Sequence, residues 1–158
     1  MQFKKYERVD MNDSLRDVIK HVKQELVNHN VQISFQYLPV IFYRKVWVQQ
    51  LLQNLISNAM KYNESEVPKI NVSFMRENGY LHLTVSDNGI GIPEQYREKI
   101  FKIFQRLHNR EKFTGTGIGL AICKKIVDQL NGVIKVQINA SDGSDFCISF
   151  PEQVELKE

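Results

Sequence analysis

Cysteine is scarce in this chain, which has only Cys123 and Cys147 among its 158 residues. Cys123 lies in a helical pattern and Cys147 in a strand pattern, and neither has neighbours at the spacing of metal ligands. We therefore expect each to be a small buried apolar side chain, and not a partner in a disulfide or a zinc site.

Long apolar runs and a strong charge of one sign are also absent. No segment approaches the length that crosses a bilayer, and no basic start is followed by an apolar signal core, so we expect a soluble, cytoplasmic chain. The 21 Lys and Arg residues against 18 Asp and Glu residues give a net charge of only +3. Because these charges are spread along the chain, no nucleic-acid partner is expected.

The chain does have the length and the 42% hydrophobic content of one globular domain with a full core. We expect this domain over residues 10–151. Residues 1–9 show no pattern and are predicted to be the stub of a linker, and residues 152–158 are predicted to be a C-terminal tail.

Several stretches show the apolar spacing of amphipathic helices. Asn12 or Asp13 is the candidate N-cap of the first, and Gly132 is expected to close the last. The predicted helices cover residues 13–28, 44–62 and 117–131, with a short one over 93–104.

Strand patterns alternate with these helices. Asn78-Gly79 between two alternating runs favours a tight hairpin turn, because both positions tolerate positive φ. Helices interleaved with antiparallel strand pairs favour an α+β fold, a two-layer sandwich with about three long helices on one face of a five-stranded mixed sheet. The predicted strands are 31–37, 70–74, 81–85, 133–138 and 146–150.

Two glycine-spaced turns are the most informative motifs. The first reads Asp87-Asn-Gly-Ile-Gly-Ile92 and the second Gly115-Thr-Gly-Ile-Gly-Leu120. Glycine has no Cβ, so it can adopt positive φ and lets backbone N–H groups converge on phosphate oxygens. Glycines also mark ordinary turns, and either motif alone would be weak evidence. The ordered pair favours a phosphorylated ligand, although neither turn is a Walker A loop or a Rossmann fingerprint.

Polar residues follow one stripe of the second predicted helix. Asn54, Asn58 and Lys61 stand at i, i+4 and i+7, and Tyr62 comes next. Such a stripe is often a solvent face. The alternative is the wall of a cleft, in which an Asn carbonyl binds Mg²⁺ and Lys61 meets phosphate charge. Asp87, after a strand, either starts a turn or accepts a hydrogen bond from an amino group such as that of adenine.

These residues resemble the catalytic and ATP-binding domain of sensor histidine kinases, which share the Bergerat-type fold with gyrase, the Hsp90 chaperones and the MutL proteins. The similarity covers about residues 10–151, and residues 104–110 are similar to phytochrome-like and PAS-linked kinases. A mobile lid is expected over 105–114. The matching segments are 54–62 (N box), 87–92 (G1 box), 100–106 (F box) and 115–120 (G2 box).

The resemblance implies ATP and Mg²⁺ as cofactors, with Asn58 holding the metal and Asn54, Asn58 and Arg106 as catalytic residues. Asp87 would read the adenine amine, and Arg106 would reach the γ-phosphate. Phe101 and Phe104 would anchor the lid; their alternative role is that of plain core aromatics. The residues implied to bind the nucleotide are Asn58, Lys61, Tyr62, Asp87, Gly89, Gly91, Ile92, Gly115, Thr116, Gly117, Ile118, Gly119 and Leu120.

One position separates branches of this group. Relatives resembling gyrase place a Glu at the position of Asn54, where it activates water as a general base. Asn cannot accept the proton, so Asn54 favours transfer to a nucleophile such as a neutral imidazole over hydrolysis.

The acceptor histidine of family kinases, which is followed by acidic and basic residues and Pro, has no match in this chain. We therefore predict a monomeric ATP-binding fragment that does not phosphorylate itself. Its implied partners are a histidine-bearing dimerisation domain of the same full-length protein and a downstream response regulator; membrane attachment of that protein stays open. The alternatives are a regulatory nucleotide-binding module without kinase activity and a serine kinase resembling anti-sigma factors, against which the F box and the long lid argue.

Overall fold

A central sheet of five strands organises the computed structural model, which describes residues 6–102 and 118–152. The strand order is β2-β4-β5-β7-β6, with β2 parallel to β4 and the other pairs antiparallel. All five predicted strands and the mixed sheet are thus confirmed. The strands are β2 (Gln32–Phe35), β4 (Lys69–Glu77), β5 (Tyr80–Asp87), β6 (Val133–Ile138) and β7 (Ser144–Pro151).

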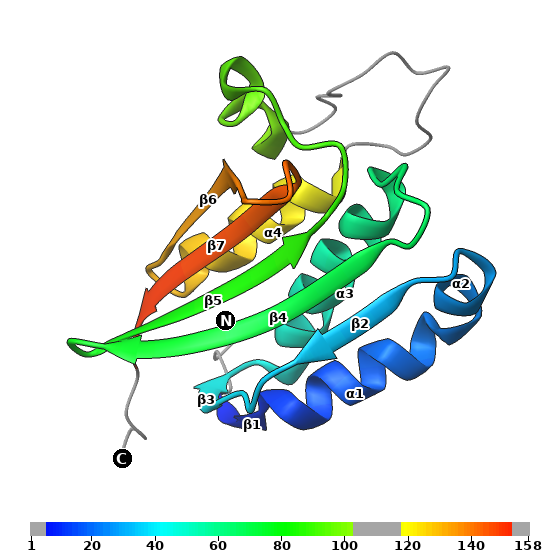
Figure 1. The fold of residues 1–158 in the computed structure, drawn as a ribbon. Coiled ribbons are helices and arrows are strands. Elements are labelled where there is room, and N and C mark those ends of the chain that lie inside the picture. The colour runs from blue at the N-terminus through cyan, green and yellow to red at the C-terminus, as the bar shows by residue number, and fades with distance from the viewer. Residues whose placement is uncertain (1–5, 103–117, 153–158) are drawn as a thin grey trace.

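The helices cover one face of this sheet, as Figure 1 shows. Along β5, the apolar residues Leu81, Leu83 and Val85 are buried and alternate with half-buried polar residues on the open face. The predicted α+β two-layer sandwich is therefore confirmed. The helices are α1 (Met11–His21), α2 (Lys23–Asn28), α3 (Lys45–Lys61) and α4 (Ile118–Gln129).

The first predicted helix is two helices in the structure. Val22 separates α1 from α2 and leaves the helical region, with φ −101° and ψ 11°. The N-cap is Asp10, whose Oδ1 accepts the backbone N–H of Asn12 at 2.9 Å. The prediction of Asn12 or Asp13 as N-cap was wrong, because Asn12 lies in the first turn and points inward.

A small second sheet was not predicted. The strands β1 (Glu7–Asp10) and β3 (Val40–Tyr43) pair antiparallel next to the start of α1. Tyr6 stacks on Tyr43, with ring centroids 5.6 Å apart. Residues 7–10, in which the sequence showed no pattern, are therefore structured.

The Asn78-Gly79 hairpin turn is confirmed, with φ of 52° and 79°. The short helix expected over 93–104 is instead two 3₁₀ turns, η1 (Glu94–Tyr96) and η2 (Lys99–Phe101), within its described part.

The end of α4 differs from the prediction. Asn131, and not Gly132, takes the positive φ of 58° that ends the helix. Gly132 is required for another reason: a Cβ there would lie 2.5 Å from the carbonyl oxygen of Ser149 on β7. Its N–H donates to the carbonyl of Val127.

Both cysteines are free, with Cys123 buried in α4 and Cys147 half-buried on β7. In the part of the chain that the structure describes, no helix has the length and apolar content to cross a bilayer.

Asn12 ties α1 to the chain before β3, and its removal should destabilise the fold. Its Nδ2 donates to the carbonyl of Leu38 at 2.9 Å and its Oδ1 accepts the N–H of Leu38 at 2.8 Å, in a buried place. Asn12→Ala leaves both backbone groups unpaired, so we expect it to lower the free energy of unfolding by about 2–3 kcal/mol in urea. The exposed Asn28→Ala should stay within about 0.5 kcal/mol of wild type. Equal effects of the two variants would contradict this role.

Candidate functional site

The first glycine turn meets the C-terminal end of α3. Ile90 donates its backbone N–H to the carbonyl of Tyr62 at 3.0 Å. A Cβ on Gly89 would lie 2.3 Å from that same Tyr62 oxygen, so glycine is required here by close approach. Gly91 has a φ of 74°, which side chains rarely adopt. The turn is thus packed backbone to backbone against the helix that carries the Asn stripe.

Asp87 ends β5 at the base of this turn and is only 7% exposed. Its Oδ1 accepts the backbone N–H groups of Gly89 at 2.9 Å and Ser144 at 3.1 Å. Burial raises the pKa of this carboxyl, and the two hydrogen bonds offset only part of that effect. Both bonds use Oδ1, and no described residue donates to Oδ2, so Oδ2 keeps its capacity to accept a hydrogen bond from a ligand.

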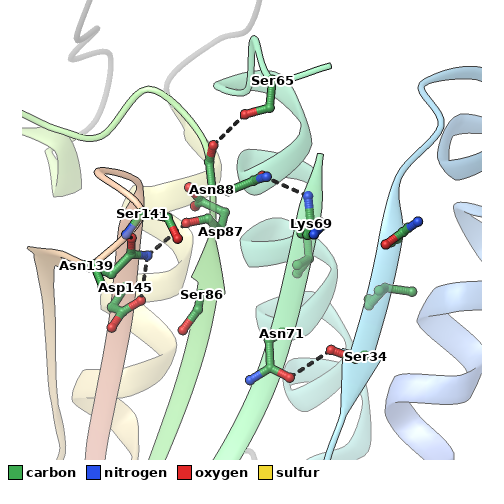
Figure 2. A pocket seen from close by; sticks show the side chains of 14 residues that line it. Ser34, Ser65, Lys69, Asn71, Ser86, Asp87, Asn88, Asn139, Ser141 and Asp145 are labelled. Atoms are coloured by element: carbon green, nitrogen blue, oxygen red, sulfur yellow. Dashed lines mark hydrogen bonds between the residues drawn. The ribbon is translucent and has the colours of Figure 1, made fainter. Parts of the chain in front are cut away.

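Asn88, for which no role was predicted, fastens the turn to the loop that follows α3. Its Oδ1 accepts from Asn63 Nδ2 at 2.9 Å and from the N–H of Lys69 at 2.8 Å. Its Nδ2 donates to the carbonyl of Val67, and its own carbonyl accepts from Ser65 Oγ at 2.6 Å. Figure 2 shows Asn88 between Ser65 and Lys69. Its place beside a glycine turn was the one sequence feature that could have indicated this role, but its partners are brought to it only by the fold.

Asn54 faces the start of α4, which holds the described part of the second glycine motif. A Cβ on Gly119 would lie 3.6 Å from Asn54 Oδ1, an ordinary van der Waals contact. Asn54 Nδ2 is buried and has no hydrogen-bond partner among the described residues. A buried unpaired amide costs free energy, and a ligand that accepts from it would recover that cost. The structure therefore brings one residue of the Asn stripe to the second motif.

The other predicted residues fall into three groups. On α3, Asn58 is half-buried and Lys61 is exposed, and Tyr62 caps the helix. Ile92 and the half-buried Leu120 pack with the core. Arg106, Gly115, Thr116 and Gly117, together with Phe104 and the lid, lie outside the described residues, and Ile118 begins α4.

Phe101 packs edge-on against Phe146 of β7, with centroids 6.2 Å apart. This contact favours its alternative role as a core aromatic.

A hollow of about 920 Å³ lies on the open face of the sheet, beside Asp87 but away from the helices (Figure 2). It is lined by polar side chains such as Ser34, Asn71 and Ser86. These residues belong to β2, β4 and β5. Ser65, Asp87 and Asn88 also line the hollow, so it borders the first glycine turn.

Comparison with known proteins gives the family. The model of the histidine kinase-, DNA gyrase B- and HSP90-like ATPases matches residues 44–154. Phytochrome-like protein Cph1 of Synechocystis is 37% identical over 142 residues, which cover 90% of this chain and 19% of that protein. The nucleotide-free catalytic domain of histidine kinase ThkA has a TM-score of 0.80 at 26% identity, covering 96% of this chain and 97% of that domain. Full-length ShkA in complex with AMPPNP shares the fold, with a TM-score of 0.81 at 22% identity over 99% of this chain and 33% of that one.

The chain therefore belongs to the histidine kinase-, DNA gyrase B- and HSP90-like ATPase family, and it is homologous to the catalytic domain of sensor histidine kinases. It spans about a fifth of the length of the phytochrome relatives that it matches. The serine-kinase and regulatory-module alternatives are not favoured by these relatives.

The raised pKa of Asp87 predicts a pH-dependent cost of its charge. The folded state holds this proton more tightly than the unfolded chain, so the associated stability is present below the unfolded pKa of about 3.9 and is lost as pH rises through the folded value. Asn does not titrate, so Asp87→Asn does not lose this stability as pH rises. The free energy of unfolding of Asp87→Asn relative to that of wild type, measured in urea, should therefore be higher at pH 7 than at pH 4. A comparison that favours the variant more at pH 4 would contradict the direction of the shift.

Proposed function

We propose that the chain binds Mg-ATP and transfers its γ-phosphate to a histidine on a dimerisation hairpin of the same full-length protein, in two-component signalling. The observation that carries this proposal is the convergence on α3 of both glycine motifs, with the unpaired amide of Asn54 buried between α3 and α4. The backbone contacts hold the first motif against α3, and the unpaired Asn54 amide supports the proposal that a ligand binds beside it.

The adenine end of the site is proposed at Asp87. Its carboxylate is buried, is oriented by two N–H groups on Oδ1, and has Oδ2 left to accept from the exocyclic amine of adenine. Gly89, Gly91 and Ile92 follow Asp87 in the same turn and are proposed to line the base.

The phosphate end is proposed between α3 and the start of α4. Backbone N–H groups at a helix N-terminus attract phosphate oxygens, and α4 begins at Ile118, within the second glycine motif. The residues of that motif from Gly115 to Leu120 are proposed to bind the phosphates. The side-chain amide oxygen of Asn58 fits the oxygen preference of Mg²⁺, and Lys61 supplies a positive charge. When bound, Mg²⁺ would neutralise charge on the phosphates; Arg106 is proposed to meet the γ-phosphate.

Asn54 supports transfer over hydrolysis. An amide in the position next to the phosphates has no basic group to take a proton from water, so water is not activated there. A histidine brought by the hairpin has its own nucleophilic nitrogen. A response regulator is the proposed next phosphate acceptor. A cytoplasmic location is part of this proposal, because the reaction consumes ATP.

Asn58→Ala tests the metal assignment. The variant removes the oxygen proposed to bind Mg²⁺, so ATP affinity measured by calorimetry should fall at least about tenfold with Mg²⁺, equivalent to about 1.4 kcal/mol, and much less with EDTA. Gln50→Ala, two turns earlier on α3 at an exposed position, should bind like wild type. Unchanged Mg²⁺-dependent affinity of Asn58→Ala would remove Asn58 from the metal site.

Phosphotransfer itself is tested by mixing the chain with a separate histidine hairpin from the same gene or a sensor kinase relative. With γ-labelled ATP and Mg²⁺, we expect label on the hairpin in an acid-labile form, and none on a hairpin whose histidine is replaced by Ala. Measured ATP binding without any labelled hairpin would leave a nucleotide-binding module and reject the kinase proposal.

A further inference from the structure

The turn between β6 and β7, residues 139–143, packs directly on the first glycine turn, although no predicted motif falls in it. A Cβ on Gly143 would lie 2.1 Å from the carbonyl oxygen of Asp87. From the other side, a Cβ on Gly91 would lie 2.6 Å from the carbonyl oxygen of Asp142. The two turns therefore touch through their backbones, with one glycine on each side of the contact.

Asn139 holds this contact together through both ends of its amide. Its Oδ1 accepts the N–H groups of Ser141 at 3.0 Å and Gly143 at 3.1 Å, which shapes the turn. Its Nδ2 donates to the carbonyl of Asp87 at 2.8 Å and to Asp145 Oδ1 at 3.0 Å. Figure 2 shows the side chain of Asn139 pointing toward Asp87 and Asp145.

The same turn also orients the Asp87 carboxylate. Ser144 follows Gly143 directly, and its N–H donates to Asp87 Oδ1. Asn139 thus fixes the main chain of Asp87 by a direct bond, and its side chain through the shape of the turn. Both effects determine the direction in which Oδ2 is presented.

We propose that Asn139 is a positioning residue that sets purine selectivity by holding Asp87 in line with the base. This inference rests on the proposed function. An aligned carboxylate accepts from the 6-amino group of ATP and opposes the 6-oxo group of GTP. A misaligned carboxylate loses the hydrogen bond from the 6-amino group of ATP and repels the 6-oxo group of GTP less. Selectivity therefore falls, although Asn139 itself is not proposed to contact the nucleotide.

The experiment measures the affinities of the intact chain for ATP and GTP in Asn139→Ala and Asn139→Asp. Asn139→Asp keeps the acceptor for the turn N–H groups and loses the donor to Asp87. We expect both variants to weaken ATP binding about tenfold or more, with a smaller change for GTP, so that the ATP to GTP preference falls. Asn71→Ala, on the open face and bonded to Ser34, is the matched control and should change neither affinity more than about twofold.

A second readout separates positioning from a general loss of structure. In an Asp87→Asn background, Asn139→Ala should weaken ATP binding less than threefold, because its effect passes through Asp87. The inference would be overturned if Asn139→Ala weakened ATP binding as much in the Asp87→Asn background as in wild type. An unchanged ATP to GTP preference in the single variants would also overturn it. Failure of the wild type to bind ATP would instead reject the proposed function and the inference with it. If thermal melting shows Asn139→Ala to be unfolded, Asn139→Asp carries the same comparison.

Discussion

The constraint on which the site depends is the close approach of three backbones at the turn after β5. The carbonyl of Tyr62 at the end of α3 lies against Gly89, and the β6–β7 turn lies against Asp87 and Gly91. A Cβ at Gly89, Gly91 or Gly143 would meet a backbone oxygen at 2.1–2.6 Å. Backbone cannot move aside as a flexible side chain can, so the position of Asp87 is set by segments that are distant in sequence.

Neutral amides make most of the connections around this contact. Asn88 ties the glycine turn to the loop after α3, and Asn139 ties it to the β6–β7 turn. Asn12 makes a similar connection elsewhere in the fold, between α1 and Leu38. An amide donates and accepts at once, so it can join two backbone segments without the desolvation cost of a buried ion pair. Asp87 is the exception, because it is a buried carboxyl whose pKa stays raised by burial although Gly89 and Ser144 donate to its Oδ1.

Much of the fold could be predicted because its pattern is local. The apolar stripe of α3, the alternation along β4 and β5, and Asn78-Gly79 each depend on neighbours within a few residues. The short β1 and β3 could not, since they stabilise each other across about thirty residues and carry little alternation of their own. The break at Val22 was hidden because apolar spacing continues through it.

The site was predicted unevenly for the same reason. Asp87, Asn54 and the glycines lie in recognisable motifs, and the structure brings Asp87 to α3 and Asn54 to Gly119. Asn88 and Asn139 were missed because their importance comes from partners that only the fold supplies. The sequence also does not say why a glycine is required at a given position. Gly132 was expected to close a helix, but it is required because a Cβ there would meet the carbonyl oxygen of Ser149.

The two-sided pairing of β5 has a kinetic consequence. Every residue of this strand is paired with β4, and all but Asp87 are also paired with β7. Amides held in this way exchange with solvent only when much of the sheet opens, so β5 should include some of the slowest exchanging amides of the described chain. Asp87, at the end of this strand, is therefore attached to a part of the sheet that opens rarely, and its carboxyl would meet a ligand as a group already fixed in place.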